Sequence, residues 1–166
     1  MTAKVVPLND SEEELWRALM RVVLGLPRRL DDDLMKASGL SAREYIALVS
    51  LSEAPGCRLR MADLARAAAQ SPSHMSRLVD DLMSRDLVAK QGSGDDQRES
   101  VAVLTSTGLA QLRLAWRFHL SDVRGLVFDH VDPAVVDEVA QALSDIAEEL
   151  ERRRSPQSSA SSRAPR

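Results

Sequence analysis

Residues 61–105 decide the fold, and they read MADLARAAAQSPSHMSRLVDDLMSRDLVAKQGSGDDQRESVAVLT. Their pattern predicts a short helix, a turn, a longer helix and then a two-stranded ribbon with a polar tip. A short helix followed by a helix with polar residues near its N-terminus is typical of a helix-turn-helix, whose second helix enters a DNA groove. The ribbon would then be a wing beside that helix.

The second helix of this stretch has clear start signals and two different faces. Ser71 is a typical N-cap residue, and Pro72 occupies the first helical position, where no N–H is needed. One face is apolar and consists of Met75, Leu78, Val79 and Leu82. Ser73, His74 and Arg77 lie off that face, and such side chains bind phosphates or base edges. The alternative is an ordinary amphipathic helix with a solvated polar face.

The ribbon favours the DNA-binding interpretation. Residues 88–91 and 100–105 contain β-branched residues and predict two strands, joined by a glycine-bearing tip. Arg98 is the only cation of the tip, and one Arg on a thin ribbon suits the minor groove, where negative potential is concentrated. Asp96 can hold that Arg in position. A solvated turn with an incidental ion pair is the alternative.

The composition is that of a globular protein with a core of aliphatic side chains. The 166 residues are 44% hydrophobic and 3% aromatic, and the net charge is −3. Residues 57–100 contain seven basic and seven acidic side chains. A DNA-binding surface there has to arise from the segregation of these charges, because there is no excess of positive charge.

The sequence predicts no membrane segment, cofactor or metal. The single cysteine, Cys57, excludes an internal disulfide and fits a reducing compartment. No apolar run is long enough to span a bilayer and the start has no signal-peptide pattern, so we expect a cytoplasmic protein. His119, His130 and the acidic run 31–33 do not have the spacing of a metal site.

Catalysis is not expected either. The chain has no nucleophile elbow, no glycine-rich phosphate loop and no zinc-ligand spacing. The alternative to DNA binding comes from another class of protein. A winged-helix adaptor that binds a protein partner and not DNA would be compatible with the balanced charge of residues 57–100.

Helical patterns precede the central stretch. Residues 11–24 start with a capping box of Ser11 and Glu14, Pro27 interrupts the pattern, and residues 28–37 resume it. This predicts one kinked helix or two short helices.

A second helix is predicted over residues 40–53, with Ser41 and Glu44 as its capping box. Residues 58–60 are few but can add a third strand to the wing. Residues 62–68 form the predicted first helix of the helix-turn-helix, and their small apolar side chains allow close packing against the second.

Helical patterns also follow the central stretch. Thr105 can cap a long helix over residues 106–129, and Asp132-Pro133 starts a last helix. The apolar residues of that last helix recur every three or four positions and are Val136, Val139, Leu143, Ile146 and Leu150. Because this helix lies outside the winged unit, we interpret the seam as part of a dimer interface. Residues 152–166 are rich in Ser, Arg, Ala and Pro and are predicted to be disordered.

Most of the chain, about residues 11–151, resembles the MarR family of bacterial winged-helix transcription regulators. The resemblance is strongest in LARAAAQSPSHMSRLVDDLMSRDLV, residues 64–88. The motif Asp96-Gln97-Arg98 and the run VAVLTSTG, residues 101–108, add to it. The order of elements makes the match more specific than a lone helix-turn-helix.

The resemblance implies an architecture. The fold would be mainly α (α+β), a winged helix-turn-helix with N- and C-terminal helices that form a helical dimerisation domain. Residues 39–105 would be the DNA-binding domain. Residues 1–38 and 106–151 would form the dimerisation domain, and residues 152–166 the tail.

The resemblance also implies a function. Such a protein is a homodimer that binds pseudo-palindromic double-stranded DNA, often as a repressor. The residues that would contact or support the DNA are Ser71, Ser73, His74 and Arg77 at the major groove, with Arg98 in the minor groove and Asp96 orienting it. A phenolic or lipophilic effector would bind between the dimerisation helices and the winged unit and lower the affinity for DNA.

Three residues depart from the family pattern. Asp86 stands where Gly usually ends the recognition helix, and Asp tolerates a left-handed conformation better than most residues. Ala69 replaces a common Gly in the turn between the two helices. Arg60 replaces a frequent capping Ser or Thr, so we expect a less well capped helix after it.

Overall fold

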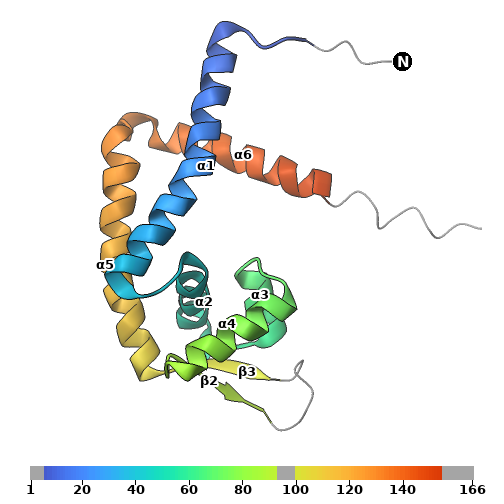
Figure 1. The fold of residues 1–166 in the computed structure, drawn as a ribbon. Coiled ribbons are helices and arrows are strands. Elements are labelled where there is room, and N and C mark those ends of the chain that lie inside the picture. The colour runs from blue at the N-terminus through green and yellow to red at the C-terminus, as the bar shows by residue number, and fades with distance from the viewer. Residues whose placement is uncertain (1–5, 93–99, 155–166) are drawn as a thin grey trace, which may run out of the picture. The chain divides into compact units, whose positions relative to one another are not determined.

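The structure is a computed structural model that describes residues 6–92 and 100–154. The chain divides into two compact units, with the boundary between Val123 and Arg124. The elements in chain order are α1 (Asp10–Ser38), α2 (Ala42–Glu53), η1 (Pro55–Cys57), β1 (Arg58–Arg60), α3 (Met61–Ala67), α4 (Pro72–Ser84), β2 (Val88–Gln91), β3 (Val101–Leu104), α5 (Ser106–Leu126), η2 (Phe128–His130), η3 (Pro133–Val135) and α6 (Val136–Arg154) (Figure 1). The roles predicted for residues 1–38, 39–105 and 106–151 remain predictions.

The first helix starts two residues earlier than predicted. Asn9 is its N-cap, and its side-chain oxygen accepts a hydrogen bond from the backbone N–H of Glu12 at 3.0 Å. The carboxylate of Glu12 accepts in return from the backbone N–H of Asn9 at 2.8 Å. The predicted capping box of Ser11 and Glu14 is therefore wrong. Both pairs have the right spacing, and Asn is as good an N-cap as Ser, so the sequence pattern could not separate them.

Pro27 lies inside α1, which continues without a break to Ser38. Of the two predicted alternatives, one helix across Pro27 is therefore correct and two short helices are not, although a proline in a helix interior costs about 3 kcal/mol. Contacts after the proline stabilise the helix. Leu34 is buried in the core, and the carboxylate of Asp31 accepts a hydrogen bond from the backbone N–H of Ala42 at 2.6 Å.

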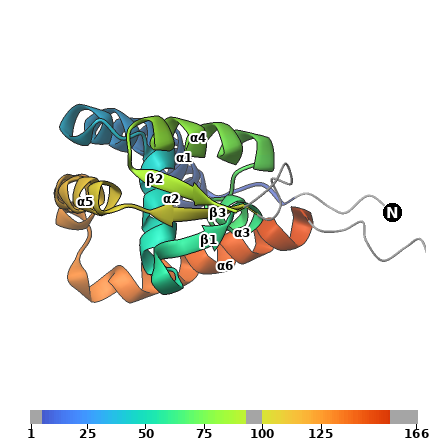
Figure 2. The same ribbon diagram turned by 90° about the horizontal axis from the view of Figure 1, so that it is seen from below.

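The sheet has three antiparallel strands in the order β1-β3-β2 (Figure 2). The short segment 58–60 supplies the edge strand β1, which confirms the predicted third strand. Leu59 in β1 and Lys90 in β2 both lie opposite Ala102 of the central strand. This sheet joins the helix-turn-helix to the start of α5, so the wing and the recognition helix belong to one folded unit.

One hydrophobic core holds the winged region together. Side chains from α2, α3 and α4 meet there, and α2 contacts α3, β1 and β3. The largest fully buried side chains are Leu34, Leu40, Leu48, Leu51, Leu64, Met75, Val79 and Leu82. These elements form a mainly helical fold with a small antiparallel sheet, as the sequence predicts.

The C-terminal unit ends in the helix α6. Asp132 accepts a hydrogen bond from the backbone N–H of Ala134 at 2.9 Å, so the predicted cap-then-proline pair starts the 3-10 helix η3, and α6 begins after it at Val136. The helix continues to Arg154, two residues beyond the start of the segment predicted to be disordered. The rest of that segment, residues 155–166, lies outside the described residues.

Candidate nucleic-acid interface

Helix α4 has the two faces that the sequence predicts. The hydroxyl of Ser71 accepts a hydrogen bond from the backbone N–H of His74 at 3.3 Å, and Pro72 follows at the first helical position. The buried face consists of Met75, Val79 and Leu82, each with no exposed surface, and Leu78 is partly buried. Ser73, His74 and Arg77 are exposed. The hydrophobic core therefore leaves the N-terminal half of α4 with its polar side chains in solvent.

The turn between α3 and α4 brings these two helices together. Ala69 has a φ of 50°, in the left-handed region, where a non-glycine residue is strained. Its backbone N–H donates to the carbonyl of Arg66 at 3.1 Å, and that of Gln70 donates to the carbonyl of Ala65 at 2.8 Å. These bonds close α3 and hold the alanine in the conformation that glycine usually adopts in this turn.

Several acidic side chains of the winged region are paired with basic ones. Asp63 pairs with Arg66 at 3.0 Å, and Asp80 pairs with Lys90 of β2 at 2.7 Å. Asp81 lies 3.3 Å from Arg85. Within the described residues, Arg77 has no carboxylate within 4.0 Å. The carboxylates of α4 are thus paired toward its C-terminal end, and a free guanidinium remains near its N-terminal end.

The connection from α4 to the wing depends on Asp86, whose φ is 57°. The hydroxyl of Thr105 donates to the Asp86 carbonyl at 2.6 Å, and that of Thr107 donates to the Asp86 carboxylate at 3.1 Å. The Thr105 hydroxyl also accepts from the backbone N–H of Gly108 at 2.9 Å, as expected of the cap of α5. Asp86 therefore takes the left-handed position usually held by glycine, as the sequence predicts.

Gly108 permits a close contact between α5 and this connection. A Cβ at this position would lie 2.0 Å from the backbone oxygen of Leu87 and 2.8 Å from Leu104. Only a residue without a side chain fits there. The other departure from the family pattern, at Arg60, also has the expected effect, because no side chain caps the start of α3.

The structure brings together four of the six predicted DNA-binding residues. Ser71, Ser73, His74 and Arg77 are all exposed on the first two turns of α4 and its cap. Asp96 and Arg98 lie outside the described residues, so their predicted role in the wing remains a prediction. The strands that would carry the wing tip, β2 and β3, are paired as predicted.

A cavity of about 300 Å³ lies between α1, α2 and α5, and sequence reasoning did not identify its residues. Its lining side chains are Leu26, Pro27, Leu30, Leu34, Ala42, Tyr45, Ile46 and His119. The rings of Tyr45 and His119 lie 4.8 Å apart and are tilted by 47°. The Tyr45 hydroxyl and the His119 Nδ1 are buried and have no hydrogen-bond partner among the described residues.

The environment keeps Tyr45 in its neutral form. Burial raises the pKa of the Tyr45 phenol above its usual value, and the negative charge of Glu53 raises it further. Among the described residues, those that line the cavity include no Asp, Glu, Lys or Arg. A mainly apolar cavity with a few polar groups that lack partners has the composition of a small-molecule site. The sequence contains no motif for this cavity, because His119 lacks the spacing of a metal site and Tyr45 is the single tyrosine of the chain.

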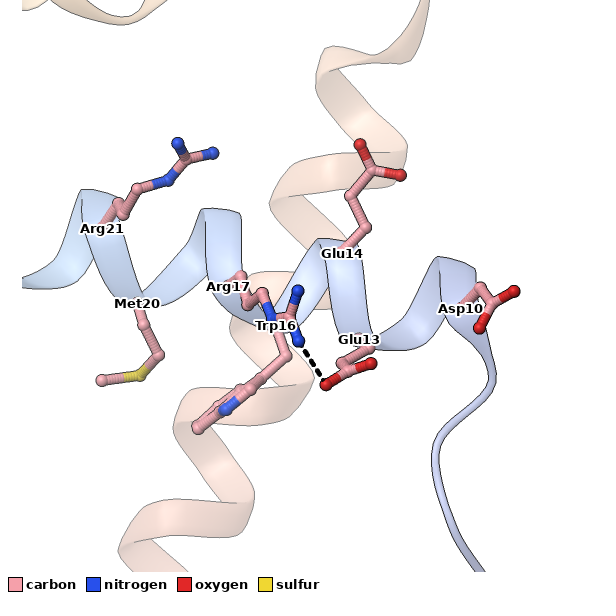
Figure 3. A pocket seen from close by; sticks show the side chains of 7 residues that line it. All are labelled: Asp10, Glu13, Glu14, Trp16, Arg17, Met20 and Arg21. Atoms are coloured by element: carbon pink, nitrogen blue, oxygen red, sulfur yellow. Dashed lines mark hydrogen bonds and ion pairs between the residues drawn. The ribbon is translucent and has the colours of Figure 1, made fainter.

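The outer half of α1 presents a shallow hollow lined by its own side chains (Figure 3). Trp16 and Met20 lie on one side of the helix, and Glu14 and Arg21 lie on the other. Arg17 pairs with Glu13 at 2.6 Å. Trp16 is 53% exposed, so a large apolar ring faces solvent here.

The part of the chain that the structure describes contains no group of three His, Cys, Asp or Glu side chains placed to hold a metal ion. It also contains no helix that is long and apolar enough to cross a membrane.

The fold and the exposed face of α4 define a winged helix-turn-helix protein, and comparison with known proteins identifies its family. The MarR family model matches residues 38–99. AbsC from Streptomyces coelicolor, a MarR family transcriptional regulator, is 35% identical, with a TM-score of 0.77 over 89% of this chain and 99% of that one. No curated protein matches the sequence.

A second protein from the same organism is also similar. Sco3205, a MarR family transcriptional regulator solved in complex with DNA, is 31% identical, with a TM-score of 0.77 over 87% of this chain and 94% of that one. BldR from Sulfolobus solfataricus shares the fold at 22% identity, with a TM-score of 0.68 over 86% of this chain and 99% of that one. The chain belongs to the MarR family of transcriptional regulators, which is not a family of enzymes.

Proposed function

We propose that the protein is a cytoplasmic transcriptional regulator that binds double-stranded DNA in a sequence-specific manner. The exposed N-terminal half of α4 carries this proposal, because Ser73, His74 and Arg77 face solvent there and Arg77 has no carboxylate partner among the described residues. A free guanidinium and two further hydrogen-bonding groups at the start of a recognition helix suit base edges and phosphates. The crystallised complex of the similar protein Sco3205 with DNA supports the same conclusion.

The balanced charge of the winged region does not favour the alternative of a protein-binding adaptor. The acidic residues Asp80 and Asp81 of α4 are compensated by Lys90 and Arg85. Among the described residues, Arg77 near the N-terminal end of α4 therefore has a positive charge that no carboxylate compensates, although the sum over residues 57–100 is zero.

The DNA-binding proposal is tested by selection from a random duplex library, followed by titration of the selected duplex at several salt concentrations. We expect the affinity to fall steeply with salt, because each phosphate contact releases counterions. Arg77→Ala should weaken binding and, if Arg77 contacts a phosphate, reduce the salt slope by about one. Arg17→Ala is the matched control, because it removes an arginine whose ion pair lies within α1. Failure to select any duplex would contradict the proposal.

The wing has a separate test. We propose that Arg98 enters the minor groove and that Asp96 orients it, as the family resemblance implies. Arg98→Ala should then weaken binding to the selected duplex, and a duplex with a widened minor groove should lose less affinity on the same substitution. Unchanged affinity of Arg98→Ala, together with a loss for Arg77→Ala, would exclude this role.

We also propose that the protein acts as a homodimer on a pseudo-palindromic operator. Three helices expose large apolar side chains, and a chain of this size rarely leaves so many in water. They include Leu15, Trp16, Val22, Val23 and Leu24 of α1, Trp116, Phe118 and Leu120 of α5, and Val139, Leu143, Ile146 and Leu150 of α6. A second copy could cover these surfaces symmetrically and set two recognition helices about one DNA turn, roughly 34 Å, apart.

Sedimentation tests the dimer. We expect the wild-type protein to sediment as a dimer at micromolar concentration, and Leu143→Asp to shift it toward the monomer, because a carboxylate would be buried in the apolar seam. Asp145→Asn, on the same helix, is a control in which a charge is lost outside the seam. A wild-type monomer at micromolar concentration would contradict the proposal.

We propose further that the protein is a repressor released by an effector that occupies the cavity between α1, α2 and α5. Its volume of about 300 Å³ lies at the lower end of the range for ligand sites, about 300–1,000 Å³. The free polar atoms of Tyr45 and His119 can bond a hydroxyl or carbonyl group, and the absence of a charged lining residue favours an uncharged aromatic molecule.

A probe pair tests the effector site. Benzyl alcohol should raise the unfolding temperature of the protein more than benzoate, because burial of a carboxylate without a charged partner is costly. The stabilisation by benzyl alcohol should be smaller in Tyr45→Phe/His119→Leu, because the ligand hydroxyl loses both of its proposed hydrogen-bond partners. An equal response of the wild type and this double variant to benzyl alcohol, or a preference of the wild type for benzoate, would exclude this cavity as the site of an uncharged ligand. In a reporter assay, deletion of the gene should raise expression from the bound promoter if the protein represses.

A further inference from the structure

Arg85 joins three helices of the winged region, although it does not belong to the exposed face of α4. It is the C-cap residue of α4, and its guanidinium donates to the Glu44 carboxylate at 2.5 Å and to the Gly39 carbonyl at 2.9 Å. Glu44 lies in the first turn of α2, and Gly39 is the C-cap of α1. One side chain thus connects the end of α4 to the corner between α1 and α2, residues 39–45.

Both carboxylate oxygens of Glu44 accept hydrogen bonds at this corner. One oxygen accepts from the backbone N–H and the hydroxyl of Ser41, each at 2.6 Å, in the capping box of α2. The other accepts from Arg85. The Glu44 side chain is 10% exposed and that of Arg85 34%, so the pair is partly shielded from water. A charge-assisted pair that is shielded and held by further hydrogen bonds fixes geometry better than a surface ion pair.

The corner is itself rigid. The carboxylate of Asp31 accepts from the backbone N–H of Ala42 at 2.6 Å, and the side chain of Gln111 donates to the carbonyl of Ser38. Gly39 has a φ of 65° and its N–H donates to the carbonyl of Met35 at 2.8 Å, which closes α1. Arg85 therefore attaches α4 to a point that α1, α2 and α5 hold in place.

The two ends of α4 are held in different ways. At the N-terminal end the polar contacts are local, between Ser71 and the residues 73–74. At the C-terminal end Arg85 bonds to other helices. Because α4 has 13 residues and is therefore about 20 Å long, a small tilt at its C-terminal end moves the exposed residues at the other end by a larger distance.

We propose that Arg85 is a positioning residue for DNA recognition, which sets the orientation of α4 through Glu44 and Gly39 without touching the DNA. This inference rests on the proposed DNA-binding function. It assigns a role in DNA affinity to a contact between residues 41 positions apart in the chain.

The experiment compares binding of the full-length variants to the duplex selected by the wild-type protein, at several salt concentrations and well below the unfolding temperature of each variant. Arg85→Ala should bind about tenfold more weakly, since groups in one network contribute about 0.5–3 kcal/mol through their coupling. Its salt slope should equal that of the wild type, because no phosphate contact is lost. Arg77→Ala is the reference for loss of a direct DNA contact. Arg17→Ala is the reference for a substitution that should not affect DNA binding.

Two further variants separate orientation from folding. Glu44→Gln preserves the capping box, which accepts Glu or Gln, but removes the nearer of the two carboxylate charges that pair with Arg85, the other being Asp81. It should lower the affinity in the same direction, and Arg85→Ala/Glu44→Gln should be no weaker than Arg85→Ala alone. Arg85→Lys should be intermediate, because one ammonium cannot reproduce the planar fork that reaches both partners. If Arg85→Ala does not fold, Glu44→Gln and Arg85→Lys test whether the contact positions α4.

Three outcomes would overturn the inference. Wild-type affinity in folded Arg85→Ala, or in folded Arg85→Lys and Glu44→Gln, would restrict Arg85 to a role in stability. A salt slope reduced by about one would show a direct phosphate contact instead. A wild-type protein that selects no duplex would contradict the proposed function and this inference together, whereas the first two results contradict the inference alone.

Discussion

The winged region and the long helices α1 and α6 differ in what they do with their apolar side chains. In the winged region Leu48, Leu64 and Leu82 have no exposed surface, whereas Leu143 in α6 is 50% exposed and Leu24 in α1 is 71% exposed. No side chain of α6 from residue 136 to residue 153 is buried. The winged region therefore has a core of its own, while the outer part of α1 and all of α6 have helical patterns whose apolar faces are uncovered in the single chain. Substitutions of apolar residues in the winged region should therefore lower the stability of the fold. Substitutions on the exposed apolar faces of α1 and α6 should weaken the proposed association of two chains.

The largest effect is expected from a change of Gly108. In Gly108→Ala the new Cβ would meet the Leu87 backbone oxygen at 2.0 Å, so α5 would have to move away from the wing. We expect a loss of about 3 kcal/mol or more in the free energy of unfolding. Gly25→Ala is the matched control in α1, where a Cβ meets nothing within 4 Å, and it should gain up to about 1 kcal/mol. Urea unfolding followed by circular dichroism measures both, and similar effects of the two substitutions would contradict the comparison.

The next largest effect is expected when a buried leucine is replaced, and an exposed leucine provides the comparison. Leu82→Ala removes a side chain with no exposed surface and should cost about 2–5 kcal/mol of unfolding free energy. Leu143→Ala should instead raise the dissociation constant of the dimer, with little effect on the unfolding of dissociated chains. Sedimentation and urea unfolding at low and high protein concentration distinguish the two. A cost at Leu143 that does not depend on protein concentration would show that α6 is covered within one chain.

A smaller effect is expected at the helix caps. Ser71→Ala removes the acceptor of the His74 N–H and should cost about 1 kcal/mol, because this helix start belongs to the folded winged unit. Asn9→Ala removes the equivalent bond at the exposed start of α1. Its effect on global unfolding should be smaller, since the end of a helix without tertiary contacts can fray locally. Thermal unfolding compares the two, and an equal loss would contradict the idea that α1 is loosely held at its start.

The smallest effect at neutral pH is expected at Tyr45. Its hydroxyl is buried and has no hydrogen-bond partner in the described part of the chain, so Tyr45→Phe should leave the stability unchanged or raise it slightly. Alkaline pH should reveal a difference. The pKa of Tyr45 is higher in the folded state than the usual value of about 10, so its contribution is present below pH 10 and is lost as the pH rises through the folded-state pKa. Tyr45→Phe should lose less stability above pH 10 than the wild type. Identical profiles of unfolding free energy against pH for the two proteins would show that ionisation of Tyr45 does not contribute.

The sequence predicts those features that depend on hydrogen bonds and backbone preferences of residues close together in the chain. Ser41 with Glu44, Ser71 with Pro72, and Thr105 all cap helices where their spacing indicates. Asp86 adopts the left-handed conformation required by the turn. Where two local patterns compete, as at the start of α1, the sequence does not discriminate between them because both satisfy the same hydrogen-bonding rule.

Contacts between distant residues could not be predicted in this way. Arg85 meets Glu44 across 41 positions and the Gln111 side chain meets Ser38 across 73. Tyr45 and His119 stack only because α2 and α5 pack together. The exposed face of α4 could be read from helical periodicity, whereas the cavity and the contacts that hold the far end of α4 depend on the tertiary fold.

The corner between α1 and α2 has a thermodynamic consequence. Ala42 and Tyr45 line the cavity, while Gly39 and Glu44 hold Arg85 at the end of α4. An effector in the cavity and DNA on α4 would therefore act on one short segment. Coupling between two binding sites is reciprocal, so an effector that weakens DNA binding tenfold must itself bind tenfold more weakly to the DNA-bound protein, a difference of about 1.4 kcal/mol. The number of occupied operators would then help to set the effector concentration at which the protein responds.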